Sequence, residues 1–213
     1  MTYRRKDAFY ARAKAAGYRS RAAYKLLDLA RRYRLIERGD HVVDLGAWPG
    51  GWLQVAAQLT GPTGVVVGVD LQPVERLGPP VITIVGDALE ASVQEQVRAA
   101  CGGRVDALLS DMAPKLSGVR DRDAARAQEL AEAALGIAER LLAPGGRLLL
   151  KLFTGPGSDA IVAAARRRFE TVKLTSTEAT RKGSAELYMV ARGFRPTAPG
   201  TAGGPPAGTA LAG

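Results

Sequence analysis

Short apolar runs alternate with helical segments along most of the chain. Nearly continuous apolar runs, typical of strands buried on both faces of a parallel sheet, occur at residues 41–45, 64–70, 81–87, 105–111 and 147–153. Apolar residues at helical spacing occur between and after them, at 50–59, about 90–100, 122–142 and 158–168. In the segment 122–142 they form a stripe of Leu130, Ala134, Ile137 and Leu141. This alternation predicts a doubly wound α/β fold with helices on both faces of the sheet.

The last two predicted strands break the alternation. Residues 170–176 and 185–192 have strand patterns, and only the short segment 177–184 separates them. A parallel connection needs a crossover of a dozen or more residues, whereas a hairpin needs few. We therefore expect a seven-stranded, mostly parallel sheet with one antiparallel strand.

The two ends of the chain depart from this pattern. Residues 1–18 are at most partly helical in pattern, and residues 20–34 form an amphipathic helix for which Ser20 is the expected N-cap. Residues 195–213 are mainly Pro, Gly, Ala and Thr without apolar periodicity, which is typical of disorder. We expect an N-terminal extension over 1–18, one domain over 19–194 and a tail over 195–213.

The composition excludes several classes of protein. One cysteine and one histidine exclude an internal disulfide and leave almost no scope for a Cys/His metal site. No run of about 20 apolar residues predicts a membrane span, and the basic N-terminus lacks the apolar core of a signal peptide. We expect a cytoplasmic, monomeric protein that binds neither metal nor membrane.

The excess positive charge lies in the N-terminal part of the chain. Residues 1–34 hold eleven Lys and Arg against two acidic residues, and their net charge of +9 equals that of the whole chain. Six of the twelve aromatic residues lie there too. Cations that neutralise phosphates and rings that stack on bases suit a nucleic acid. A solvated basic helix face fits the same segment equally well.

A glycine-rich loop follows the first predicted strand. The segment DLGAWPGGW (44–52) has neither G-x-G-x-x-G nor a P-loop lysine, so a pyrophosphate suits it poorly. The next three strands end at Asp70, Asp87 and Asp111, where ligands bind in doubly wound sheets. Each aspartate alone could be a loop or helix cap. Together with an acidic, aromatic loop, they favour a nucleoside with a positive centre, such as S-adenosylmethionine (AdoMet).

Five segments of the chain resemble the successive motifs of one enzyme family. They are YRSRAAYKLLDL (18–29), VVDLGAWPGGW (42–52), SDMAPKLSG (110–118), LLLKLFTGPG (148–157) and AELYMVARG (185–193). These motifs are similar to those of the FtsJ/RrmJ (RlmE)-type 2′-O-ribose methyltransferases of large-subunit ribosomal RNA. The resemblance covers roughly residues 3–194. It implies the Rossmann-like fold of class I AdoMet-dependent methyltransferases.

The resemblance also implies roles for individual residues. The residues implied to contact AdoMet are Gly50, Trp52, Asp70, Asp87 and Asp111. The implied catalytic tetrad is Lys25, Asp111, Lys151 and Glu186. Two positions depart from the family pattern: Trp48 replaces a small residue, and Lys115 replaces a common asparagine.

The tetrad suits methyl transfer to a weakly acidic hydroxyl. Lys151 interrupts an apolar strand and Glu186 opens another, which is costly unless each is paired. A structural salt bridge of Lys151 with Asp111 or with Glu186 would explain either pair alone. By resemblance, Lys151 accepts the proton of the ribose 2′-hydroxyl, Asp111 orients it, and Lys25 and Glu186 position the ribose. A lysine that stays protonated would instead stabilise the developing alkoxide, and both roles are consistent with the sequence.

The substrate implied by the resemblance is a uridine of large-subunit ribosomal RNA, on the assembled 50S subunit. The short length and basic N-terminus favour this substrate over tRNA or an mRNA cap. A methyltransferase of base amino groups would carry D/N-P-P-Y/F where this chain has SDMAP, and a non-catalytic RNA-binding protein would not need the tetrad. The side chains expected to hold RNA phosphates are Arg4, Arg5, Lys6, Arg19 and Arg21.

Overall fold

The computed structural model describes residues 8–115, 117–155, 157–177 and 186–196. Its strands are β1 (His41–Leu45), β2 (Val65–Asp70), β3 (Val81–Val85), β4 (Val105–Ser110), β5 (Leu142–Phe153), β6 (Phe169–Thr175) and β7 (Glu186–Phe194). Its helices are α1 (Ala8–Ala15), α2 (Ala22–Tyr33), α3 (Gly51–Thr60), α4 (Ala91–Ala100), α5 (Arg120–Leu141) and α6 (Ser158–Arg168). The predicted RNA-binding residues Arg4, Arg5 and Lys6, and most of the predicted tail, lie outside the described residues.

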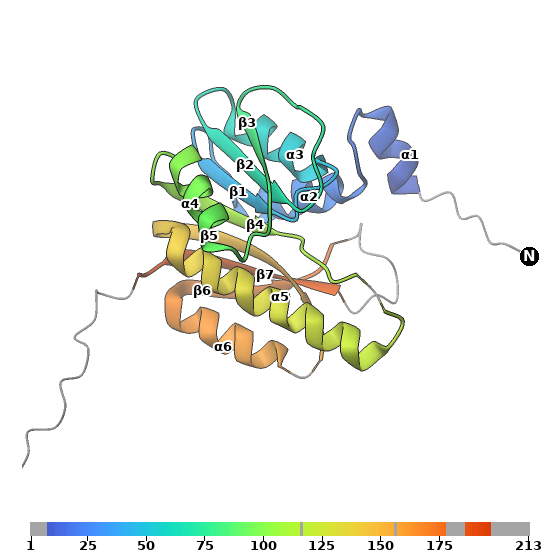
Figure 1. The fold of residues 1–213 in the computed structure, drawn as a ribbon, viewed down its shortest axis with the longest axis vertical. Coiled ribbons are helices and arrows are strands. Elements are labelled where there is room, and N and C mark those ends of the chain that lie inside the picture. The colour runs from blue at the N-terminus through green and yellow to red at the C-terminus, as the bar shows by residue number, and fades with distance from the viewer. Residues whose placement is uncertain (1–7, 116, 156, 178–185, 197–213) are drawn as a thin grey trace, which may run out of the picture.

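Within the described part of the chain, seven strands form one sheet in the order β3-β2-β1-β4-β5-β7-β6 (Figure 1). Strands β1 to β5 pair in parallel, and β7 is antiparallel to both of its neighbours, β5 and β6. The predicted fold, a mostly parallel sheet with one antiparallel strand, is confirmed. The polarity reverses at β7 because the β6–β7 connection is too short for a crossover helix.

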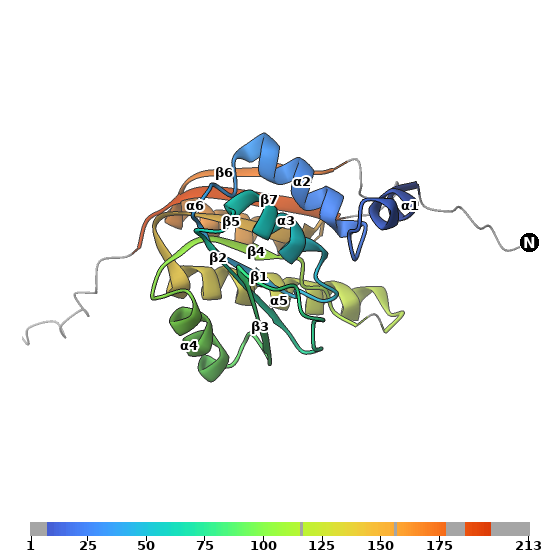
Figure 2. The same ribbon diagram turned by 90° about the horizontal axis from the view of Figure 1, so that it is seen from above.

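Helices cover both faces of the sheet, as Figure 2 shows from above. One face packs against α2 and α3, and the other against α4, α5 and α6, with a separate apolar cluster on each side. Alternation along the strands decides which side chains reach which cluster. In β5, Leu149 belongs to the α2–α3 cluster, whereas Leu148 and Leu150 belong to the opposite one.

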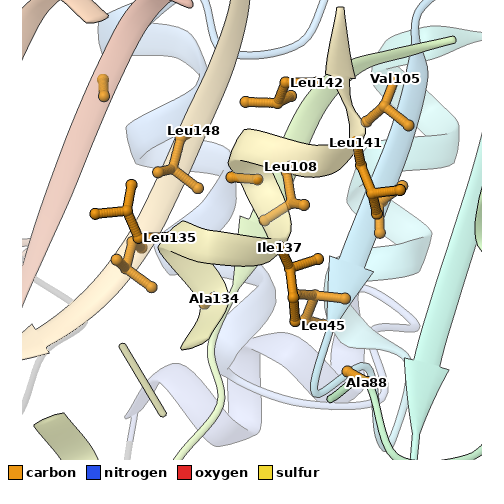
Figure 3. Packing of buried hydrophobic residues seen from close by; sticks show 14 of the residues in the cluster. Leu45, Ala88, Val105, Leu108, Ala134, Leu135, Ile137, Leu141, Leu142 and Leu148 are labelled. Atoms are coloured by element: carbon orange, nitrogen blue, oxygen red, sulfur yellow. The ribbon is translucent and has the colours of Figure 1, made fainter. Parts of the chain in front are cut away.

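Helix α5 lies along the sheet and contributes much of the larger cluster (Figure 3). Ala134, Ile137 and Leu141 of its predicted apolar stripe are buried against the strands. Leu130, the first residue of that stripe, is only half-buried and lines a cavity at the end of the sheet. The stripe therefore packs in the core toward the C-terminal end of the helix and lines a cavity nearer its N-terminal end.

Three expectations for these elements are wrong. Strand β3, expected to be buried, is the edge strand, and Ile82 and Val85 are exposed. Strand β5 begins at Leu142, before the expected start, because the Pro-Gly-Gly segment forms an irregularity in its pairing with β4. Helix α2 has Arg21 at its N-cap position, without a side-chain cap. Ser20 packs against Gly51 instead, so tertiary packing overrides the local capping preference.

The described residues lack two kinds of feature. None of the helices described has the length and apolar character needed to cross a membrane. Within the same residues, no three His, Cys, Asp or Glu side chains are grouped so that they could hold a metal ion.

Candidate active site

A cavity of about 670 Å³ opens at the carboxyl ends of strands β1 to β4. Its walls come from the loop after β1, the ends of β2, β3 and β4, and Leu130 of α5. The predicted cofactor residues Asp70, Asp87 and Asp111 line it. Ligands bind in this position in doubly wound sheets, because the loops that follow parallel strands converge there.

The loop after β1 is held close to the sheet by its glycines. The Gly46 N–H donates to the Val69 carbonyl at 2.9 Å, and Gly46 has a φ of +80°. A Cβ at Gly46 would lie 3.2 Å from backbone atoms of Met112. A larger residue would therefore force the loop away from the end of β4.

Gly50 and Trp52 are not among the residues that line the cavity. Gly50 occupies the N-cap position of α3 with a φ of +106°. Trp52 is buried in the α2–α3 cluster, and its indole N–H donates to the carbonyl of Ala22 at 2.8 Å. Trp48, the departure from the family pattern, is 53% exposed and lines the cavity. Of the two tryptophans, it is therefore Trp48 that lines the cavity.

Backbone N–H groups hold the carboxylates at the ends of β2 and β3. The two Asp70 oxygens accept from the backbone N–H groups of Trp48 and Gln72, each at 2.8 Å. Asp87 accepts from the N–H of Leu89 at 2.9 Å. Each carboxylate oxygen keeps a further acceptor site, so these side chains are fixed in place and able to receive hydroxyl or amino donors.

Asp44, near the end of β1, is a further acidic residue of this region, and it is buried. It is 1% exposed, and among the described residues neither of its oxygens accepts a hydrogen bond. Burial, followed by the nearby charges of Asp111 and Asp70, raises the pKa of Asp44 well above its ordinary value. The carboxylates of Asp70, Asp87 and Asp111 line the cavity and create a negative potential that favours a cation. The sulfonium and ammonium groups of AdoMet fit such a site, and its ribose and adenine fit the fixed carboxylates.

All four residues of the predicted tetrad meet on the α2–α3 side of the sheet. The Lys25 Nζ lies 2.5 Å from Glu186 Oε1. The Lys151 Nζ lies 2.9 Å from Asp111 Oδ1 and donates to the Asp111 carbonyl at 2.5 Å. Lys25, Lys151 and Glu186 are each no more than 13% exposed at the side chain. The structure thus forms two ion pairs that share a buried space.

Tyr188 joins these two pairs. Its hydroxyl donates to Asp111 Oδ1 at 3.0 Å and accepts from Lys25 Nζ at 3.3 Å. Burial, followed by the charges of Asp111 and Glu186, strongly raises the pKa of Tyr188, so the phenol remains a proton donor. The result is a continuous chain of contacts: Glu186, Lys25, Tyr188, Asp111 and Lys151.

The register of β5 and β7 produces this arrangement. Lys151 lies directly opposite Tyr188, and Glu186 lies two residues before Tyr188 on the same face of β7. Tyr188 was not among the residues predicted from the sequence. Its spacing of two from Glu186 was the available signal, because a buried tyrosine needs a partner for its hydroxyl.

The two described members of the predicted RNA-binding set lie in the linker before α2. The Arg19 guanidinium donates to three backbone carbonyls, and its side chain is 19% exposed. Arg21 is half-buried at the start of α2. The Arg19 side chain is therefore directed into the protein rather than toward solvent.

The fold and the site together define a class of protein. A seven-stranded sheet with an antiparallel β7, and an acidic cavity that fits AdoMet, are features of Rossmann-like AdoMet-dependent methyltransferases. The family model for the FtsJ-like methyltransferases matches residues 18–194. The chain belongs to this family, and its methyl donor is AdoMet.

Curated relatives and solved structures agree with the family. The chain is 51% identical over 195 residues to "Ribosomal RNA large subunit methyltransferase E" of Natronomonas pharaonis, covering 92% of this chain and 76% of that protein. A protein of the same name from Methanothrix thermoacetophila is 47% identical over 192 residues, covering 90% and 74%. A crystal structure described as a ribosomal RNA methyltransferase of Plasmodium falciparum has a TM-score of 0.73 at 25% identity, covering 83% of this chain and 98% of that one.

Proposed function

We propose that this protein transfers the methyl group of AdoMet to a ribose 2′-hydroxyl of large-subunit ribosomal RNA. The names of relatives that are 44–51% identical support this substrate. The observation that carries the chemistry is the buried Lys151 Nζ, 2.9 Å from Asp111 at the rim of the cavity. A lysine in that position serves a reaction in which a hydroxyl loses its proton beside a cofactor.

The side chains of the polar chain have separate tasks in this proposal. Bound AdoMet supplies an electrophilic methyl group. Lys151 acts on the proton of the 2′-hydroxyl at its Nζ, either by accepting it or by stabilising the alkoxide that forms. Asp111 holds the Lys151 amine through its carboxylate and its carbonyl. Lys25 and Glu186, held together by a short contact, position the ribose.

The cavity residues would hold the cofactor. Asp70 would accept hydrogen bonds from the ribose of AdoMet and Asp87 from its adenine side, while Asp111 favours its positive groups. Gly50 and Trp52 would act indirectly, by fixing the backbone at the start of α3, which follows the loop.

The finer parts of the proposal come from the charge map and the family resemblance. We infer that Arg4, Arg5, Lys6 and Arg21 hold phosphates, because the N-terminal segment carries the whole net charge of the chain. From the resemblance we also propose that the target is a uridine and that the substrate is the assembled 50S subunit. We further propose that the enzyme is monomeric and cytoplasmic.

The test is tritium transfer from labelled AdoMet to undermethylated large ribosomal subunits, followed by mass mapping of the RNA. The wild type is expected to modify one ribose, and Lys151→Ala to lose 10²–10⁴-fold in turnover while still binding AdoMet. Lys173→Ala, an exposed lysine of β6, is the matched control and should keep its activity. Methylation of a base, or normal turnover by Lys151→Ala, would contradict the proposal. Transfer to tRNA or to a capped mRNA instead would select the alternative substrates.

A further inference from the structure

Arg19 lies where three separate segments of the chain meet. Its Nη1 donates to the Glu75 carbonyl at 2.6 Å and, at 3.4 Å, to the Pro49 carbonyl, and its Nη2 donates to the Arg76 carbonyl at 3.2 Å. Pro49 belongs to the loop after β1, whereas Glu75 and Arg76 belong to the connection between β2 and β3. One guanidinium therefore ties these two loops to each other and to the linker before α2.

The backbone at Arg19 is itself fixed against α3. The Gln54 side chain accepts from the Arg19 N–H at 2.8 Å and donates to the Gly17 carbonyl at 2.9 Å. The Tyr18 hydroxyl donates to Gln58 at 2.9 Å. The linker is thus anchored at Gly17, Tyr18 and Arg19, so the guanidinium approaches the two loops from a defined direction.

Carbonyl contacts, rather than the nearby salt bridge, account for this arrangement. The Glu75 carboxylate lies 3.5 Å from Arg19, but its side chain is 88% exposed, and such a pair contributes little in water. A Cβ at Gly50 would lie 3.0 Å from Arg19 Nη1. The loop therefore approaches the guanidinium so closely that Gly50 leaves almost no space between them.

The two tied loops continue directly into the walls of the cofactor cavity. Trp48, next to Pro49, lines the cavity and donates its N–H to Asp70. Leu71 and Gln72, three to four residues before Glu75, line it as well. A shift of the Pro49 and Glu75 carbonyls would therefore be transmitted within a few residues to the groups that surround AdoMet.

We propose that Arg19 is a positioning residue for the AdoMet cavity, and that it does not bind RNA phosphates as the charge pattern predicted. Its donors point at carbonyls of the protein, so an RNA phosphate would have to displace contacts already made. Lysine cannot replace it, because a single ammonium lacks the fork of donors that reaches carbonyls in two loops. The RNA part of this proposal rests on the proposed function, whereas the cofactor part does not.

The experiment compares AdoMet binding by calorimetry, without RNA, in the wild type and three variants. Arg19→Ala should raise the Kd for AdoMet ten- to hundredfold, equivalent to about 1.4–2.8 kcal/mol, and Arg19→Lys should raise it at least fivefold. Glu75→Ala removes only the exposed salt bridge and should leave the Kd within twofold of the wild type. The affinity for ribosomal RNA should change less than twofold in Arg19→Ala, with an unchanged salt slope.

Thermal denaturation of each variant separates positioning from general destabilisation. A lower Tm in Arg19→Ala with unchanged AdoMet affinity would overturn the proposal, as would a weaker RNA affinity with a smaller salt slope. If Arg19→Ala does not fold, Arg19→Lys carries the same comparison, since it keeps the charge and most of the side chain. A wild type that binds AdoMet but does not methylate ribosomal RNA would refute the proposed substrate and leave the Arg19 comparison intact.

Discussion

The ion pair between Lys25 and Glu186 offers a test that separates stability from catalysis. The two side chains are 9% and 13% exposed and lie 2.5 Å apart. Removing one partner of a buried pair costs about 3–5 kcal/mol. Because the pair keeps some exposure, we expect Lys25→Met to lower the free energy of unfolding by about 2–4 kcal/mol. This cost includes the loss of the Lys25 contact with Tyr188.

The double variant Lys25→Met/Glu186→Gln should be more stable than the sum of the single effects predicts. We expect a coupling energy of about 1.5–3 kcal/mol, the upper part of the range for residues in direct contact. Urea denaturation followed by circular dichroism measures the four corners of this cycle. For a chain of this length, each kcal/mol corresponds to about 2–4 °C in Tm, so thermal denaturation is an independent check.

In the double variant, turnover should stay low although part of the lost stability is recovered. If Lys25 and Glu186 position the ribose, the double variant lacks both groups and should remain at least tenfold slower than the wild type in the tritium-transfer assay. Two results would refute this reasoning. A coupling energy below about 0.5 kcal/mol would show that the pair is not an energetic unit. A double variant with wild-type turnover would show that the pair is only structural.

Three further predictions follow from buried groups and backbone geometry. Since burial raises the pKa of Asp44 in the folded state, the contribution of Asp44 to the free energy of unfolding falls as pH rises above the ordinary carboxyl value of 3.8. Asp44→Asn should therefore raise Tm at about pH 7, and this gain should disappear as the pH falls toward 3.8. The same variant should bind AdoMet more weakly in calorimetry. A gain in Tm that does not depend on pH would contradict this prediction. Gly46 has a φ of +80°, and a Cβ there would lie 3.2 Å from the Met112 backbone. Gly46→Ala should therefore lower the free energy of unfolding in urea by about 2 kcal/mol and weaken AdoMet binding. Unchanged stability would contradict this prediction. Burial, then Asp106, raises the pKa of Cys101 to about 11, so a thiol reagent should react with it only after urea is added, and rapid reaction of the native protein would refute this.

Local sequence patterns were sufficient for most of the fold. Apart from α1 and the early start of β5, each strand and helix was predicted within a few residues, because apolar periodicity is a property of contiguous residues. The antiparallel β7 followed from a connection length alone. The burial of β3 was predicted wrongly, because an apolar run does not specify whether a strand lies in the middle or at the edge of a sheet.

The site was less predictable than the fold, since its contacts depend on register. The cost of burying Lys151 and Glu186 indicated that each needed a partner, but a pairing of Lys151 with Glu186 remained open. In the structure Lys151 pairs with Asp111, and Glu186 pairs with Lys25. The bridging hydroxyl of Tyr188 depends on how β5 and β7 align, and that alignment is not encoded in either strand alone.

The Arg19 contacts show a limit of charge counting. Eleven basic residues in the first 34 indicated a surface for phosphates, but a net charge does not show which side chains face solvent. Arg19 is held by carbonyls from residues 30 to 57 positions away. Only the folded backbone brings those acceptors to it.

The position of β7 has a consequence for the order in which the molecule can fold during synthesis. It is the last of the described strands in sequence order, yet it lies between β5 and β6, and β6 has no other neighbour in the described sheet. While the ribosome is still making residues 142–175, β6 has no strand to pair with, and the site lacks Glu186 and Tyr188. Domains tend to fold from the N-terminus as they emerge, but here the reaction centre closes only when the final strand inserts.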